Sequence, residues 1–225
     1  MNSRCTAALA VIAGCGLSAH AQTLIDNFEL PETRIGTDSG ADFGPFTPTG
    51  ATSAFDERRI GAGLRSGTGN VELISDAMGN GVMHHRADPT AAGYGFFNWR
   101  SGLVDLTDGG TMTGIQIRVL SNEVALRLYF FATDVDDNYG EGGLNIPGGI
   151  ASPTDFFFPF ADLMNFQGIV DFSRMELLQL EINSGGIAAV PGTDLQLDFI
   201  QSNTPAPASA ALLALGGLCA TRRRR

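Results

Sequence analysis

Hydrophobic and polar residues alternate with a period of two along the middle of this chain. Ile115, Ile117 and Val119 face one way, while Gln116 and Arg118 face the other. A period of two places successive side chains on opposite faces of a β-strand, whereas an amphipathic helix needs a period near 3.6. The same alternation returns in residues 124–131, 178–182 and 195–199. We therefore predict four strands here, each with one buried face.

Shorter apolar runs between clusters of Gly, Asp, Asn and Pro predict further strands. These runs cover residues 24–29, 60–65, 70–75, 81–86, 93–99 and 155–160. Turns or loops are predicted at 105–111, 121–123 and 134–143, and one helical turn within 161–172. About ten short strands with little helical periodicity predict an all-β fold, a β-sandwich.

The first 21 residues have the three parts of a secretory signal peptide. Arg4 gives a positive charge, residues 5–16 are almost wholly apolar, and small residues, Ala19 and Ala21, precede Gln22. This order predicts a signal helix that signal peptidase removes by cutting between Ala21 and Gln22. The apolar stretch is far shorter than the roughly 18–20 residues that span a bilayer.

Cys15 offers an alternative fate for the same segment. The run from Ile12 to Cys15, Ile-Ala-Gly-Cys, resembles a bacterial lipobox, in which the cysteine is lipidated and becomes the first residue. The apolar run before it is short, and the Ala-His-Ala site follows directly. We favour cleavage after Ala21 and keep lipidation of Cys15 as the alternative.

Residues 202–225 read as a linker, an apolar stretch and a basic end. Pro205 and Pro207 interrupt the linker 202–207, and residues 208–220 contain only Ala, Leu, Gly, Cys and one Ser. As a helix this run is about 20 Å long, against roughly 30 Å of hydrocarbon. A block of basic residues follows as a membrane stop, which the positive-inside rule holds in the cytoplasm: Arg222, Arg223, Arg224 and Arg225. So weak a transmembrane anchor suits a processing signal.

This tail resembles a PEP-CTERM sorting domain, in a version carried by Pro205, Ala206 and Pro207. Ala206 stands where the usual motif has glutamate. The resemblance implies that an exosortase-like membrane enzyme cuts near these three residues. It also implies delivery to the cell envelope or extracellular matrix through a membrane-anchored intermediate. A plain C-terminal anchor that stays on the protein is the alternative.

The predicted mature domain, residues 22–201, is acidic and contains no cysteine. It holds all 24 acidic residues and nine of the 14 basic residues, all of them arginine, so its formal charge is −15. Cys5, Cys15 and Cys219 lie in the two ends. The charge disfavours nucleic acid and anionic membranes as partners. Without cysteine the domain has neither disulfides nor thiol catalysis.

The stretches that open and close the domain have similar patterns, "LIDNFE" at 24–29 and "LQLDFIQ" at 195–201. We therefore expect the first and last strands to pair. That arrangement resembles the jelly-roll domains of many carbohydrate-binding modules. The domain also resembles secreted proteins of planctomycete-like bacteria, in which a "DLT-x-GG" turn, "DFFFPF" and "DLQLDFI" recur before such tails. The resemblance implies a jelly-roll-like β-sandwich and an extracellular destination, and it implies no reaction.

An acidic stretch, "DVDDNYGE", is the candidate metal site. Asp134, Asp136, Asn138 and Glu141 place side-chain oxygens in one turn. Ca²⁺ prefers six to eight oxygen ligands, so this is a candidate Ca²⁺ site. The spacing departs from an EF-hand loop, because Tyr139 stands where glycine is needed. We favour the alternative, a solvated hairpin loop, because Asp and Asn favour turns on their own account.

The stretch "YGFFNWRSG" is the candidate ligand site. On a strand, Tyr94 and Phe96 share one face, and Phe97 and Trp99 share the other. One face must be core, and we expect Trp99 there, because aromatic rings bury the most apolar area. The alternative is that Tyr94 or Trp99 is exposed as a stacking platform for a saccharide.

No catalytic motif is present in the sequence. There is no G-x-S-x-G elbow, H-E-x-x-H motif, P-loop or Rossmann fingerprint. His84 and His85 are adjacent, so on a strand they point to opposite faces and cannot bind one metal together. Nothing singles out a pair of carboxylates for glycoside hydrolysis. We therefore predict that the protein is not an enzyme.

The sequence leaves two hypotheses for the function, and a third hypothesis is that Ca²⁺ stabilises the domain. The first is an exported structural or adhesive protein of the cell envelope or extracellular matrix, because a leader and a sorting tail bracket the domain. The second is a protein like a carbohydrate-binding module that binds an extracellular polysaccharide. An exposed Tyr94 or Trp99 beside a groove favours the second.

Overall fold

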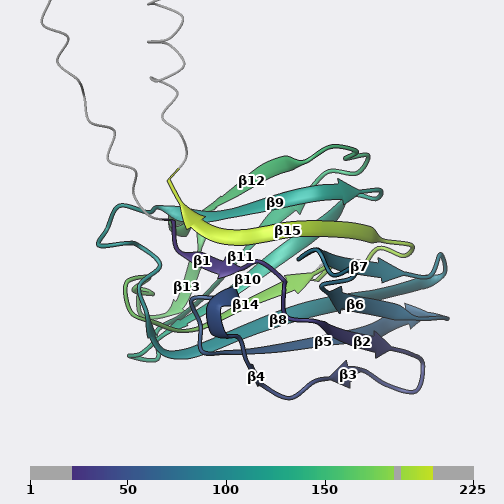
Figure 1. Cartoon of the computed structure of the whole chain (residues 1–225), viewed down its shortest axis with the longest axis horizontal. Helices are drawn as coiled ribbons and strands as arrows, with labels where there is room; N and C mark the ends of the chain where they lie inside the picture. Colours follow the sequence, from purple (N-terminus) through teal and green to yellow (C-terminus); the bar gives the residue numbers. More distant parts are fainter. Residues whose placement is uncertain (1–21, 185–188, 205–225) are drawn as a thin grey trace, which may run out of the picture.

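Two antiparallel β-sheets pack face to face in the fold (Figure 1). This is a computed structural model, and it describes residues 22–184 and 189–204. The predicted all-β sandwich is confirmed. The two helices predicted at the ends of the chain lie outside the described residues. Within the described part, no helix is long and apolar enough to cross a membrane.

The seven-stranded sheet has the last strand of the chain near its centre. Its order is β12-β9-β15-β7-β6-β2, and β1 also pairs with β15. The bounds are β1 Leu24–Asp26, β2 Glu32–Gly36, β6 Val71–Ser75, β7 Met83–Ala87, β9 Gly114–Asn122, β12 Thr154–Pro159 and β15 Asp194–Asn203. Leu24 lies opposite Gln201, so the predicted pairing of the first and last strands is confirmed.

The eight-stranded sheet forms the other layer. Its order is β13-β11-β10-β14-β8-β5-β3, with β4 also beside β5. The bounds are β3 Asp42–Phe43, β4 Thr47–Pro48, β5 Glu57–Gly67, β8 Ala91–Val104, β10 Leu126–Asp134, β11 Tyr139–Ile146, β13 Met164–Gln167 and β14 Met175–Ile182. Two short 3-10 helices complete the described elements, η1 Gly50–Thr52 and η2 Phe160–Asp162.

Every predicted strand has a counterpart, with shifted ends. The last strand reaches Asn203, two residues into the stretch predicted as linker. The predicted helical turn is the single 3-10 turn η2, which β13 follows. The loop predicted over 134–143 is wrong, because β10 runs to Asp134 and β11 begins at Tyr139. Five strands were not predicted: β2, β3, β4, β11 and β13.

The glycines of β11 explain why that strand reads as a loop. A Cβ on Gly142 would lie 2.6 Å from the ring of Phe158, and one on Gly143 would collide with Arg127. Phe158 of the facing sheet and Arg127 of the neighbouring strand β10 lie against the two faces of this strand, so glycine is needed there for close approach. The sequence pattern, however, is that of a turn.

The facing sides of the two sheets form one apolar core. Trp99 is fully buried and stacks on Phe97, with ring centroids 5.5 Å apart. Phe130 of β10 stacks on Phe158 of β12 across the sandwich, at 4.8 Å. The prediction that Trp99 is a core residue is confirmed.

A buried ion pair joins the two sheets inside this core. Asp26 of β1 and Arg58 of β5 are both fully buried, and Arg58 Nη1 lies 3.1 Å from Asp26 Oδ2. Trp99 Nε1 donates to the same oxygen at 2.7 Å. Arg58 Nη2 donates to the carbonyl oxygen of Leu30 at 2.6 Å, and the backbone N–H of Phe28 donates to Asp26 Oδ1. The carboxylate therefore receives donors from three directions.

Burial has a cost for this carboxylate. It raises the pKa of Asp26, and Arg58 and the hydrogen bonds from Trp99 and Phe28 oppose the rise. Two charges removed from water stabilise a fold only where geometry and hydrogen bonds compensate their lost hydration. Each of the two groups therefore depends on the other remaining in place.

We predict that Arg58→Met destabilises the fold by about 3–5 kcal/mol, because it leaves the Asp26 carboxylate buried without its cation. Arg86→Met is the matched control, since Arg86 pairs with Glu72 at the surface and such pairs contribute at most about 1 kcal/mol. Urea unfolding of the purified variants measures both changes. Equal losses in the two variants would contradict a structural role for the buried pair.

Candidate functional site

The outward face of the eight-stranded sheet carries aromatic rings that lie across glycines. Phe96 of β8 is opposite Gly61 of β5, and Tyr94 is opposite Gly63. A Cβ on Gly61 would collide with the Phe96 ring, and one on Gly63 would lie 2.7 Å from the Tyr94 ring. The two glycines therefore leave room for the rings on the surface of the sheet.

More rings lie on both sides of this pair. Phe43 of β3 is 48% exposed, and its centroid lies 5.4 Å from that of Phe96. At the other edge, rings follow one another across β10, β11 and β13, with centroids 5.0 to 6.4 Å apart: Tyr129, Phe131, Tyr139 and Phe166. Of these rings, Phe43 and Phe166 are exposed, Tyr129 is buried, and the others are half-buried. Rings that remain partly exposed side by side on one face make that face the candidate binding surface.

Polar side chains occupy the space between the two groups of rings. A groove of about 260 Å³ is lined by Phe43, Arg59, Tyr94, Phe96, Asn98, Gln179 and Glu181. Asn98 Nδ2 donates to Gln179 Oε1 at 3.0 Å, and Gln179 Nε2 donates to Glu181 Oε1 at 2.9 Å. Asn98 Oδ1 is buried and has no hydrogen-bond partner among the described residues, so the acceptor capacity of this amide is unused.

A second series of side-chain hydrogen bonds lies at one end of the groove and ends at Glu181. Arg65 Nη2 donates to Ser184 Oγ at 2.9 Å, and that hydroxyl donates to Glu181. The Arg65 guanidinium also lies 5.0 Å from the centroid of Tyr94. Both oxygens of Glu181 therefore accept hydrogen bonds from within the protein.

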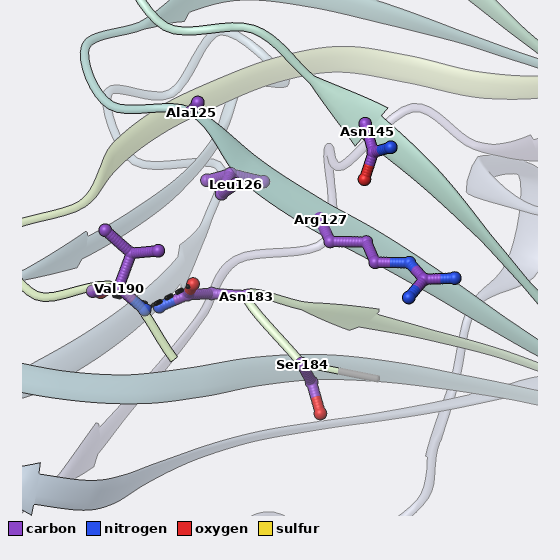
Figure 2. A pocket seen from close by; sticks show the side chains of 7 residues that line it. All are labelled: Ala125, Leu126, Arg127, Asn145, Asn183, Ser184 and Val190. Carbon is purple, nitrogen blue, oxygen red and sulfur yellow. Dashed lines mark hydrogen bonds between the residues drawn. The ribbon is translucent and has the colours of Figure 1, made fainter. Parts of the chain in front are cut away.

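A second cavity, of about 230 Å³, adjoins this end of the sheet (Figure 2). Asn183 shapes it: its backbone has φ of 60°, and its Nδ2 donates to the carbonyl oxygens of Gly93 and Val190. Arg127 of β10 lies opposite Asn145 of β11 and also lines the cavity. Ser184, which lines the cavity, donates a hydrogen bond to Glu181, which lines the groove, so the two sites are neighbours.

The outward face of the seven-stranded sheet is different in kind. Its charged groups pair across strands, with Arg118 Nε 2.7 Å from Asp155 and Arg86 Nε 2.6 Å from Glu72. His84 Nε2 lies 2.9 Å from Asp194. Charges that neutralise one another leave few groups for a ligand, so the aromatic face is the candidate site.

Of the predicted ligand residues, Tyr94 lies in the groove and Trp99 does not. The alternative that Trp99 is a stacking platform is wrong, because its ring is fully buried and its Nε1 donates a hydrogen bond to Asp26. As predicted, His84 and His85 point to opposite faces. His84 lies outside, and His85 is buried, which lowers its pKa to about 3.

The predicted calcium ligands do not converge on one point. Asp134 Oδ1 accepts the backbone N–H groups of Asp136 and Asn138, and Asp134 Oδ2 accepts those of Asn138 Nδ2 and the Asp171 backbone. Burial raises the pKa of Asp134, but these donors outweigh it and hold the pKa below its usual value. Because N–H donors occupy both oxygens, the carboxylate is the centre of a turn.

The other proposed calcium ligands have different partners. Asp136 pairs with Arg174 at 2.5 Å, and Glu141 accepts the Tyr139 hydroxyl at 3.0 Å on the outward face. In residues 22–184 and 189–204, no group of three or more His, Cys, Asp or Glu side chains is placed to hold a metal ion. The structure therefore agrees with the hairpin turn, not with the Ca²⁺ site.

The predicted processing residues lie at or beyond the limits of the described chain. Gln22 is the first described residue. The others are Ala21, Pro205, Ala206 and Pro207 and the four terminal arginines, all outside it. The signal peptide and the sorting tail therefore stay predictions.

No family model and no curated protein matches this chain. Among solved structures, a family 11 carbohydrate-binding module from Clostridium thermocellum in complex with a β-1,3-1,4-mixed-linked tetrasaccharide is 14% identical, with a TM-score of 0.42. The match covers 83% of this chain and 97% of that one. The agarase AgWH50C is 11% identical with a TM-score of 0.43, over 64% of this chain and 23% of the agarase. Both TM-scores are below 0.5, so these likenesses support no conclusion about the binding site of this chain.

We predict that Gly61→Ala displaces the Phe96 ring and destabilises the fold by about 1–3 kcal/mol, because a methyl group has no room beneath it. Gly102→Ala is the control on the adjacent strand β8, since a Cβ there meets nothing within 4 Å. Urea unfolding gives the two free energies. A Gly61→Ala variant as stable as Gly102→Ala would show that the ring is not fixed over the glycine.

Proposed function

We propose that this protein is a non-catalytic module that binds an extracellular polysaccharide through the outward face of its eight-stranded sheet. The observation that carries the proposal is the groove in which Tyr94 and Phe96 flank a row of amide and carboxylate groups. A sugar ring has an apolar C–H face that stacks on an aromatic ring and hydroxyl groups that need donors and acceptors. The groove provides both kinds of contact.

The register of the sheet gives this surface the length for a chain of several sugars. Glu181 lies opposite Phe96 on one side and Tyr129 on the other, so aromatic, acidic and aromatic side chains form one row. From β5 to β10 the row crosses three strand spacings, roughly 14 Å at about 4.8 Å each. An oligosaccharide fits this length better than one monosaccharide does.

The surface is also rigid before any ligand binds. The rings of Phe96 and Tyr94 pack directly against the backbone at Gly61 and Gly63. Hydrogen bonds from Asn98 to Gln179 and from Gln179 to Glu181 order the polar side chains. A surface whose side chains are already ordered loses little conformational entropy on binding. This favours recognition of a repeating polymer by a shallow face.

We propose further that the module acts outside the cell, as an adhesive component of the envelope or matrix. The support is the signal peptide pattern before Gln22 and the sorting tail pattern after residue 201. In addition, the backbone N–H of Ser202 donates to the carbonyl oxygen of Thr23, so the two ends of the domain lie together. Leader and tail are thus attached at one place on the sandwich.

We predict that Phe96→Ala lowers the affinity for the polysaccharide that the wild type binds about tenfold or more. Loss of an aromatic anchor has an effect of this size at other interfaces. Phe199→Ala is the matched control, because Phe199 lies on the seven-stranded sheet beneath Arg118. Affinity electrophoresis against soluble polysaccharides, followed by calorimetry, measures the difference. The proposed function fails if no polysaccharide binds, or if both variants bind as the wild type does.

A second prediction concerns export. The protein recovered from its own cells and medium should run from Gln22 to the neighbourhood of Pro205, Ala206 and Pro207, because both ends are predicted to be cut. Mass spectrometry of the intact chain measures this. A chain that still ends at Arg225 would mean a retained membrane anchor, and Ala206→Glu would then show whether the motif is at fault.

A further inference from the structure

Arg59 in the groove has no anionic partner among residues 22–184 and 189–204. Other arginines of this part of the chain lie within 4.0 Å of a carboxylate oxygen, among them Arg34, Arg58, Arg86, Arg100, Arg118 and Arg174. For Arg59, the described chain provides neither an ion pair nor a side-chain hydrogen bond, and its Nε is buried without a partner. In a domain with 24 acidic residues, an uncompensated guanidinium is unexpected.

Two aromatic rings hold this guanidinium in place. Arg59 Cζ lies 5.6 Å from the ring centroid of Phe43 and 5.8 Å from that of Phe46. Stacking on a ring uses the flat face of a guanidinium and leaves its N–H groups, which point outward in the plane, for other partners. The rings also displace water from the cation, which strengthens any hydrogen bond that it makes.

The acidic residue of the groove does not neutralise Arg59. Glu181 is on β14, two strands away from β5, and both its oxygens accept hydrogen bonds from Gln179 and Ser184. The residue directly opposite Arg59 is Asn98, whose Oδ1 is also without a partner. A row of in-plane N–H donors therefore lies next to an unused amide acceptor.

We propose that the groove selects acidic saccharides and that Arg59 binds their anionic group; this rests on the proposed function of the face. A guanidinium fork donates two parallel hydrogen bonds to a carboxylate or to two oxygens of a sulfate ester. The ligand class is a polysaccharide that contains uronic acids or sulfated sugars.

The negative charge of the domain is compatible with this selection. At physiological ionic strength, repulsion between exposed charges is screened beyond about 8 Å, whereas a contact in a water-poor groove is screened much less. An acidic polymer therefore binds where one of its anionic groups contacts Arg59, and the other acidic residues of the surface repel it only weakly. Recognition of the polymer then depends on the contact between that anionic group and Arg59.

Matched polymers that differ only in charge test the proposal. Polygalacturonate is compared with its fully methyl-esterified form, and a sulfated galactan with the same galactan after desulfation. The variants are Arg59→Gln and Arg59→Lys, with Arg118→Gln as control. Arg118 also stacks on a ring, Phe199, but it is paired with Asp155 on the other sheet. Calorimetry gives the affinities, and thermal unfolding verifies that each variant folds.

We expect the wild type to prefer the charged member of at least one pair, and the preferred pair distinguishes a carboxylate from a sulfate. Arg59→Gln should weaken binding of that polymer about tenfold or more and leave its neutral partner unchanged, because a charge-assisted hydrogen bond is lost. Arg59→Lys, which keeps the charge but not the fork, should recover only part of the affinity. Arg118→Gln should bind as the wild type does.

Three results would overturn the proposal. If charged and neutral members bind equally and only Phe96→Ala weakens them, the face binds polysaccharide but does not select an anion. If Arg59→Gln, folded like the wild type, keeps its preference for the charged polymer, another residue binds the anion. Absence of binding to all four polymers, with a neutral glucan bound through Phe96, also excludes acidic ligands and leaves the proposed function intact.

Discussion

The buried ion pair between Asp26 and Arg58 fixes the geometry of both sheets, because it joins β1 in one to β5 in the other. Arg58 points inward, so the next residue, Arg59, points outward into the groove. The same alternation turns Gly61 and Gly63 outward beneath the rings of β8. A shift of β5 by one residue would bury Arg59 and expose Arg58. The core pair therefore also sets the register of the candidate site.

The strands with regular alternation could be predicted from the sequence, and the rest could not, for local reasons. β8, β9, β14 and β15 bury one face each, which gives a period of two. β11 is rich in glycine because Phe158 and Arg127 lie across it, so its composition is that of a loop. β3 and β4 have two residues each and contain Asp or Pro, too little for any pattern.

The candidate site was only partly visible in the sequence for a different reason. Tyr94 and Phe96 share a face by simple alternation, and this holds in the structure. Arg59 and Gln179, by contrast, reach the groove from β5 and β14, which flank β8, and strand order cannot be derived from a period of two. The adjacent pair Arg58 and Arg59 shows the limit clearly. Both are polar: the alternation with the buried residues Ile60 and Ala62 turns Arg58 inward, but the partner that makes its burial possible, Asp26, lies 32 residues away in the sequence.

The two outward faces of the domain differ in chemical character. The seven-stranded sheet carries paired charges, and it also holds β1 and β15, the strands at which the predicted leader and tail are attached. The eight-stranded sheet forms the opposite layer (Figure 1). It carries the rings and the groove. If the domain is held at the end of β15, as proposed, it is attached through one sheet, and the outward face of the other sheet remains open. Pairing of the first and last strands makes this separation possible, because both ends of the described domain then lie in the same layer.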